Sequence, residues 1–150
     1  MPVRVIAIGQ GAAGDDGVGF AVLDQLRRDG VPPGVELLRA DEEGALVTLL
    51  ETPRAVVLVD AVLGSPPGRV VELAPADLVA SGLRPVSTHG LGVAQAIALA
   101  RTVAPEGITP SIRIVGITID RPLHYVQALS PPVAAAVAPA AARVRALVAE

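Results

Sequence analysis

The sequence predicts a three-layer α/β/α domain with a mainly parallel, twisted sheet of about five strands. Short apolar runs rich in β-branched residues alternate along the chain with segments whose apolar residues recur at helical spacing. The clearest run, residues 55–60, is continuously apolar up to its final aspartate, as expected of a strand that helices cover on both faces. The 150 residues fit one domain, so residues 1–150 are treated as a single unit.

The first part of the chain has the pattern strand, turn, helix, strand. Residues 3–8 form a short β-branched run, and a glycine-rich turn follows at residues 9–14. Apolar residues then keep helical spacing over residues 18–29. Glycines and prolines at residues 30–34 break that helix, and residues 35–38 form the second strand-like run.

The middle of the chain predicts a short helix and two strands. Residues 44–50 form the helix, which ends near Pro53, before the strand at residues 55–60. Residues 64–68, Gly-Ser-Pro-Pro-Gly, predict a turn. Residues 69–73 then predict a further strand at an edge of the sheet.

The last part of the chain predicts a helix from Leu91 to about residue 103, a strand at residues 111–117 and a final helix. Ser130 is expected to cap that final helix, with Pro131 at its first position. Alternation of strands and helices along the whole chain predicts mostly parallel pairing, because parallel neighbours need crossover connections.

The composition excludes several kinds of function. The chain has no cysteine, so it has no disulfides, thiolate ligands or cysteine nucleophile. All basic residues are arginine, which excludes chemistry that needs a lysine. A net charge of −3 with scattered arginines argues against a nucleic-acid partner. No apolar run is long enough to cross a membrane, and the start lacks the layout of a signal peptide, so we expect a cytoplasmic protein without a membrane partner.

Three residues of metal-ligating type are expected to meet at the carboxyl edge of the sheet. Asp16 follows the first strand and its glycine-rich turn, Asp60 ends the third strand, and His89 lies in a loop that opens a helix. Ligands of open α/β sheets gather where the carboxyl ends of parallel strands meet. Two carboxylates and one imidazole suit a divalent metal such as Zn, Ni or Cu, and three ligands leave a position open for substrate or water.

Each of these residues, and each neighbouring polar residue, also has a plainer interpretation. Asp15 is expected to be the N-cap of the helix that follows it, and Asp16 has the alternative of merely complementing the helix dipole. His89 has the alternative of a structural residue that bonds the loop backbone, and His124 is interpreted as a surface or packing residue. The acidic run at residues 41–43 is interpreted as a solvated helix start that also follows the second strand, where it is able to line the same cleft.

A glycine motif keeps a nucleotide-binding alternative open. Gly9, Gly11 and Gly14 match the GxGxxG pattern of a dinucleotide-binding unit, and Arg39 stands where it would meet a 2′-phosphate. The two acids that follow the motif count against this alternative, because they would place negative charge beside the pyrophosphate. Paired acids after the first strand also resemble the acidic pocket of a signalling receiver domain, but that family uses a lysine that this chain lacks.

Five segments together resemble the hydrogenase maturation endopeptidases, which trim the C-terminus of nickel–iron hydrogenase large subunits. Residues 5–11, Val-Ile-Ala-Ile-Gly-Gln-Gly, are similar to the strand and GxGN loop of that family, and residues 15–19 to its D-[DE]-x-x-G segment. Residues 58–61, Leu-Val-Asp-Ala, resemble its strand-ending aspartate. Residues 87–92, Ser-Thr-His-Gly-Leu-Gly, resemble its S-x-H-x-L-G motif, and residues 128–133 resemble the L-[ST]-P motif before its last helix.

This resemblance implies a function and a site. The family fold is a three-layer α/β sandwich, and the substrate is a large-subunit precursor whose nickel is already inserted. Asp16, Asp60 and His89 would then be both the metal ligands and the catalytic residues. The resemblance implies nickel, brought by the substrate, although another divalent metal also suits these ligands, and we expect the protease to be a monomer.

The chain departs from the family pattern at three places near the expected cleft. Ala12 replaces the asparagine of the GxGN loop, residues 40–44 replace a segment rich in glycine and threonine, and residues 118–119 replace a Glu-Pro pair. These departures bear on the substrate more than on the fold. They leave a non-proteolytic metal-binding relative as the alternative function.

Overall fold

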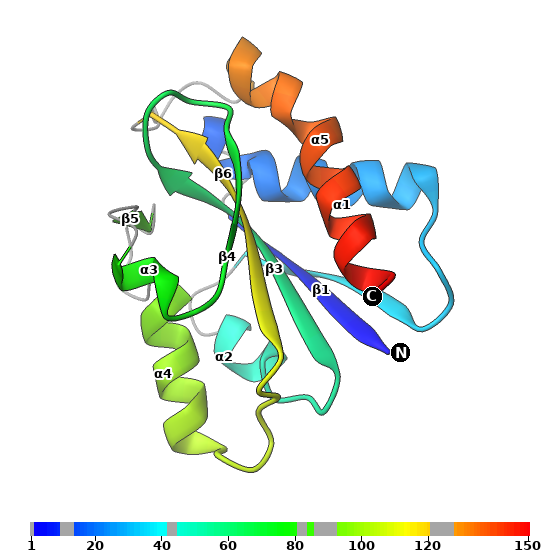
Figure 1. Cartoon of the computed structure of the whole chain (residues 1–150), viewed down its shortest axis with the longest axis vertical. Coiled ribbons are helices and arrows are strands. Elements are labelled where there is room, and N and C mark those ends of the chain that lie inside the picture. Colours follow the sequence, from blue (N-terminus) through cyan, green and yellow to red (C-terminus); the bar gives the residue numbers. More distant parts are fainter. Residues whose placement is uncertain (1, 10–13, 42–44, 81–83, 86–92, 121–127) are drawn as a thin grey trace.

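The protein folds around one sheet with helices on both faces (Figure 1). The computed structural model describes residues 2–9, 14–41, 45–80, 84–85, 93–120 and 128–150. In this part of the chain the sheet has six strands, of which five follow the order β2-β1-β3-β6-β4. They are β2 (Val35–Ala40), β1 (Val3–Ile8), β3 (Ala55–Leu63), β6 (Ile112–Ile119) and β4 (Val70–Leu73).

The sheet is mainly parallel, which confirms the predicted fold class. β1 pairs in parallel with β2 and β3, and β3 pairs in parallel with β6. β4 is an edge strand, as expected from the sequence, and runs antiparallel to β6. The very short β5 (Arg84–Pro85) pairs antiparallel with the end of β3. No sequence pattern indicates β5, because two residues carry no periodicity.

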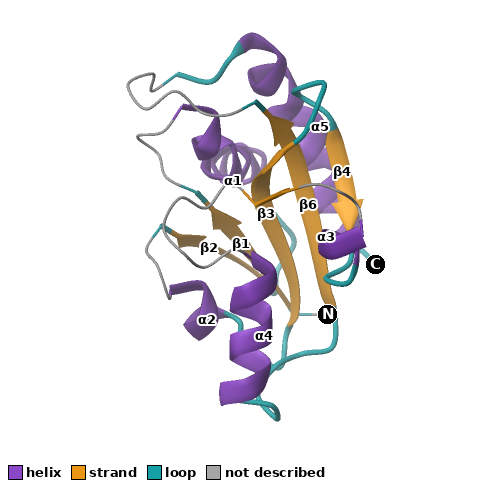
Figure 2. Cartoon of the chain, turned by 90° about the vertical axis from the view of Figure 1, so that its left-hand side faces the viewer, coloured by secondary structure: helices purple, strands orange, loops and turns teal. Residues whose placement is uncertain are grey.

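The helices form two layers, one on each face of the sheet (Figure 2). Helices α1 (Val18–Asp29) and α5 (Pro131–Val148) cover one face, and α2 (Ala45–Leu49) and α4 (Val93–Val103) cover the other. Two short elements complete the fold: the 3₁₀ turn η1 (Gly14–Gly17), which leads into α1, and α3 (Asp77–Ala80), which follows β4. No helix in the described ranges is long and apolar enough to span a membrane.

Alternation of side chains along β3 divides the core in two. Val57 and Val59 point to the face of α1 and α5, whereas Val56 and Leu58 point to the face of α2 and α4. All four are less than 5% exposed, which explains why this strand is apolar on both faces. By the same alternation, Asp60 lies on the face of α2 and α4.

β3 and β6 extend beyond β1 at the carboxyl edge of the sheet. The pairing of β1 with β3 ends at Ala7↔Val59, but the pairing of β3 with β6 continues to Leu63↔Ile119. The prediction that the third strand ends at Asp60 is therefore wrong. Three more residues follow in the strand, because β6 on one side and β5 on the other offer hydrogen-bonding partners there.

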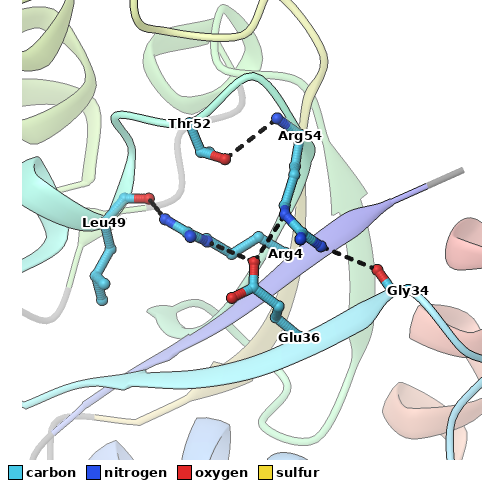
Figure 3. A network of polar contacts seen from close by, with 6 residues as sticks. All are labelled: Arg4, Gly34, Glu36, Leu49, Thr52 and Arg54. Carbon is cyan, nitrogen blue, oxygen red and sulfur yellow. Dashed lines mark hydrogen bonds and ion pairs between the residues drawn. The ribbon is translucent and has the colours of Figure 1, made fainter.

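A network of charged residues lies at the opposite, amino-terminal edge (Figure 3). The Glu36 carboxylate on β2 lies 3.2 Å from Arg4 on β1 and 3.0 Å from Arg54, which stands just before β3. Each guanidinium also donates to a backbone carbonyl: Arg4 to Leu49 at 3.0 Å and Arg54 to Gly34 at 3.2 Å. The network thus joins the amino-terminal ends of three neighbouring strands.

Candidate active site

The strand order reverses direction between β1 and β3. After β1 the chain enters α1 on one face of the sheet, and after β3 it continues toward α4 on the other face. The connections at the carboxyl ends of these two neighbours therefore diverge. Such a switch point is where open α/β sheets bind their ligands.

Asp60 lies at this switch point and is buried. The residue is only 6% exposed to solvent. It stands one position beyond the last β1 pairing, Ala7↔Val59, and two positions before the first β5 pairing, Val62↔Pro85. Across the sheet on β6 its partner is Gly116, where a side chain would press on Val62 and Val71. A carboxylate held in such a place is a strong candidate for function.

Gly19 brings the backbone of Asp16 to the same edge. A Cβ atom at Gly19 would lie 2.7 Å from the carbonyl oxygen of Ile8 and 2.8 Å from that of Val59. Only glycine allows the first turn of α1 to rest this closely on the ends of β1 and β3. The preceding turn η1, which contains Asp16, therefore also packs against β3. The structure brings the backbone of Asp16 and the residue Asp60 together at one edge.

His89 and His124 lie outside the described residues, as does the side chain of Asp16. The segment of His89 is bounded by two described points: Pro85, which pairs with Val62 on β3, and Val93, which is buried at the start of α4. Within the described part of the chain no three His, Cys, Asp or Glu side chains converge. The three-ligand site therefore stays a prediction.

Asp15 does not cap α1, so that prediction is wrong. The N-cap of α1 is Gly17, and no side chain caps it. Asp15 instead accepts two hydrogen bonds from Ser130, 115 residues away in the sequence: one from the backbone N–H at 2.6 Å and one from the hydroxyl at 2.8 Å. Ser130 is the N-cap residue of α5 with Pro131 after it, as predicted, but its hydroxyl donates to Asp15 rather than capping the helix.

Thr118, one of the residues that replace the family Glu-Pro pair, has a structural role that its sequence does not indicate. It is fully buried, donates a hydrogen bond to the carbonyl oxygen of Pro66 at 2.8 Å and accepts one from the N–H of Arg69 at 2.8 Å. These bonds fix the turn between β3 and β4 against the end of β6. At Gly68 in this turn, where φ is +88°, a Cβ atom would lie 2.5 Å from the carbonyl oxygen of Pro132.

The structure describes two residues that the sequence analysis linked to other interpretations, Arg39 and Asp41. The guanidinium of Arg39 lies 4.1 Å from the centroid of the Phe20 ring, so it makes a cation–π contact with α1. Asp41 is exposed, and the other two acids of its run lie outside the described residues, as does Gly11.

The fold and the site define an α/β/α domain with aspartates of β3 and of the turn η1 at a topological switch point. A family model for hydrogenase maturation proteases matches residues 22–146 of the chain. Because this match covers most of the sequence, the chain belongs to the hydrogenase maturation protease family, and it is a peptidase. The dinucleotide-binding, receiver and non-proteolytic alternatives are thereby set aside.

The chain also resembles solved structures and a curated relative. The chain is 25% identical to the hydrogenase maturating endopeptidase HybD from E. coli, with a TM-score of 0.74 over 98% of this chain and 91% of that one. It matches the [NiFe] hydrogenase maturation protease HybD from Thermococcus kodakarensis with a TM-score of 0.75 at 22% identity, over 98% and 99% of the two chains. It is also 33% identical over 110 residues to protein FrxA of Pyrococcus furiosus, covering 73% of this chain and 78% of that protein.

Proposed function

We propose that this peptidase removes a C-terminal peptide from the nickel-loaded precursor of a nickel–iron hydrogenase large subunit. In this proposal Asp16, Asp60 and His89 recognise the nickel that the substrate carries. The observation that supports the proposal is the close approach of Gly19 to the ends of β1 and β3, because it sets the backbone of the turn η1 against the edge where Asp60 is buried. Membership of the maturation protease family supports the substrate class.

The position of its neighbours supports His89 as the third member of the site. Pro85 and Val93 each stand four positions from His89. Four extended residues span at most about 14 Å, and Pro85 pairs with a β3 residue only two positions beyond Asp60. The start of α4, at Val93, is buried on the same face of the sheet as Asp60. The chain is therefore able to bring an imidazole to the two aspartates.

The proposed chemistry needs no serine or cysteine nucleophile. Neutral imidazole and two carboxylates are ligands that nickel accepts, and they hold the precursor through its own metal. A water that is polarised by that metal, or activated by a carboxylate, attacks the scissile carbonyl. Because nickel belongs to the substrate, a precursor without nickel would lack the group that the protease recognises.

Intact-mass spectrometry tests this function with a matched pair of histidine variants. A nickel-loaded large-subunit precursor from the same genome is incubated with the wild type, with His89→Ala or with His124→Ala. We expect the wild type and His124→Ala to release a short C-terminal peptide. We expect His89→Ala to release none, while its thermal unfolding temperature stays close to that of the wild type.

Other results would contradict separate parts of the proposal. Cleavage by His89→Ala would remove His89 from the site. A large fall in the unfolding temperature of His89→Ala would make its role structural. No cleavage by the wild type, with nickel in the precursor confirmed, would reject this substrate.

A further inference from the structure

We propose that Asp15 and Ser130 are positioning residues for Asp16, and that the first turn of α5 is the fixed point against which the site is aligned. This inference rests on the proposed function, because it takes Asp16 as a ligand of the nickel. It adds two residues that do not touch the metal. Their role is to hold the backbone of η1 in place.

The hydrogen bonds of Asp15 are suited to this role. Both carboxylate oxygens are used, and both donors belong to one residue, Ser130. Such a two-point contact fixes the orientation of the carboxylate as well as its distance. Asp16 is the next residue in the same 3₁₀ turn. A shift of Asp15 would therefore be transmitted to Asp16 through a single peptide unit.

Ser130 is itself held firmly, because α5 begins there. The N–H of Ala134 donates to the carbonyl oxygen of Ser130 at 2.8 Å, and Val133 is fully buried against the sheet. Pro131 and Pro132 occupy the first two positions of the helix, where their fixed φ restricts the backbone further. The carboxylate of Asp15 therefore accepts its hydrogen bonds from a residue whose backbone is rigidly held.

The same helix start also contacts the element that carries Asp60. Gly68 packs against the carbonyl group of Pro132, and the N–H of Gly68 donates to the carbonyl oxygen of Thr118 at 2.7 Å. Gly68 belongs to the turn that directly follows β3, the strand of Asp60. One turn of α5 therefore contacts both the turn η1, next to Asp16, and the turn that follows β3, the strand of Asp60.

A second link to α5, from the far end of α1, provides the matched control. Asp29 at the end of α1 accepts a hydrogen bond from Arg145 of α5 at 2.9 Å. This pair also ties α1 to α5, but at the end of the helices far from Asp16. If Asp15 only stabilised the packing of these helices, loss of either link would have the same consequences.

The variants Asp15→Ala, Asp15→Asn and Arg145→Ala separate positioning from other roles. Alanine removes both hydrogen bonds. Asparagine keeps an oxygen for the N–H of Ser130 and an amide that donates to its hydroxyl, so it keeps the position but not the charge. A residue that binds the metal directly would need the charge, whereas a positioning residue needs only the hydrogen bonds.

The first measurement is the NMR signal of the Asp16 backbone amide in each purified variant, without substrate. We expect Asp15→Ala to shift and broaden this signal, Asp15→Asn to restore it largely, and Arg145→Ala to leave it unchanged. An unchanged Asp16 signal in Asp15→Ala would overturn the inference. This readout does not depend on cleavage, so it decides the inference even if the proposed substrate is wrong.

The second measurement is the cleavage rate of the nickel-loaded precursor, with thermal unfolding recorded for each variant. We expect Asp15→Ala to lose at least about tenfold in rate, as partners of metal ligands do, while Asp15→Asn and Arg145→Ala stay close to the wild type. Equal rate losses for Asp15→Ala and Arg145→Ala would reduce the contact to general stability. Equal losses for Asp15→Ala and Asp15→Asn would make Asp15 a direct participant and overturn the positioning role.

Discussion

The two edges of the sheet use carboxylates in opposite ways. At the amino-terminal edge, Glu36 lies between two arginines, Arg4 and Arg54, and its negative charge is matched by positive charge (Figure 3). At the carboxyl edge, Asp15 is bound by the neutral donors of Ser130, and Asp60 is buried in a strand. The amino-terminal edge therefore surrounds its acid with charged partners, whereas the carboxyl edge holds Asp15 by neutral donors and Asp60 in a buried strand.

This difference separates structural charge from functional charge. An acid that faces arginines at salt-bridge distance adds stability and has little left to offer a ligand. Neutral donors, such as those that hold Asp15, orient a carboxylate without placing a positive charge beside it. The carboxyl edge, where the switch point lies, is the edge that we propose for the substrate.

Replacing Gly19 is expected to have the largest effect, because it would disturb the seat of α1 at the carboxyl edge. In Gly19→Ala the new methyl group would clash with two backbone carbonyl oxygens, which are able to shift only together with their strands. We expect a loss of about 2–3 kcal/mol in the free energy of unfolding, or roughly 5–10 °C in unfolding temperature, measured by calorimetry.

Gly30→Ala is the control for this prediction. Gly30 also has an unusual backbone, with φ of +82°, but no atom lies within 4 Å of its added Cβ. With φ +82° and ψ 152° it lies in a region that is essentially restricted to glycine, so its replacement is expected to cost about 1–3 kcal/mol from backbone strain alone. A Gly19→Ala variant as stable as the wild type would show that the close approach is not the reason for its glycine.

Replacing Glu36 tests the amino-terminal edge. Glu36→Ala would leave the half-buried guanidinium of Arg4, whose side chain is 19% exposed, without its carboxylate partner. We expect a loss of about 1–2 kcal/mol in denaturant unfolding and an unchanged cleavage rate. Asp24→Ala breaks an exposed pair with Arg27 and is expected to change stability by less than about 0.5 kcal/mol. A fall in the cleavage rate of Glu36→Ala would show that the two edges are coupled.

The smallest expected effect is a pH dependence at Asp29, near the amino-terminal edge. A hydrogen bond from Gln25 lowers the pKa of this exposed carboxyl below its usual value, desolvation opposes this, and Arg145 and Arg28 add to the lowering. Because the folded-state pKa is lowered, the contribution to stability is present above the usual pKa of roughly 3.9 and is lost as the pH falls through the lower folded value.

Thermal unfolding of the wild type and of Asp29→Asn is measured between about pH 6 and about pH 2.5, the range in which such carboxyls titrate. The difference between the two proteins gives this contribution. The wild type should be slightly more stable at the upper end, and the difference should vanish toward the acidic end. High salt should reduce it, since the pair is exposed. A difference that grew as the pH fell would have the wrong sign.

Local patterns predicted most of the fold, because the main strands are apolar and the longer helices are amphipathic over many residues. The exceptions have physical reasons. β5 is too short to show any pattern, and β3 continues past Asp60 because partners from distant segments pair with it there. An aspartate within an apolar run is the usual sign of a strand end, and local sequence does not report such partners.

The edge that holds Asp60 and the backbone of Asp16 was predictable, but the contacts around it were not. Parallel pairing sets both at the carboxyl ends of their strands, and this required only the order of the elements. The partner of Asp15 was not predictable, because an acid next to a helix start is normally interpreted as the cap of that helix, whereas its true partner is far away in the chain. The role of Thr118 depends in the same way on the turn that packs against it.

If Asp15 and Ser130 position Asp16 as proposed, their contact also determines when the site is able to form. It joins residues 115 positions apart, and α5 supplies much of the core on its face of the sheet. During synthesis on the ribosome, a chain that has grown only as far as β6 possesses Asp16 and Asp60 but not α5. In this proposal the newly made protease acquires its aligned site only once α5 has docked.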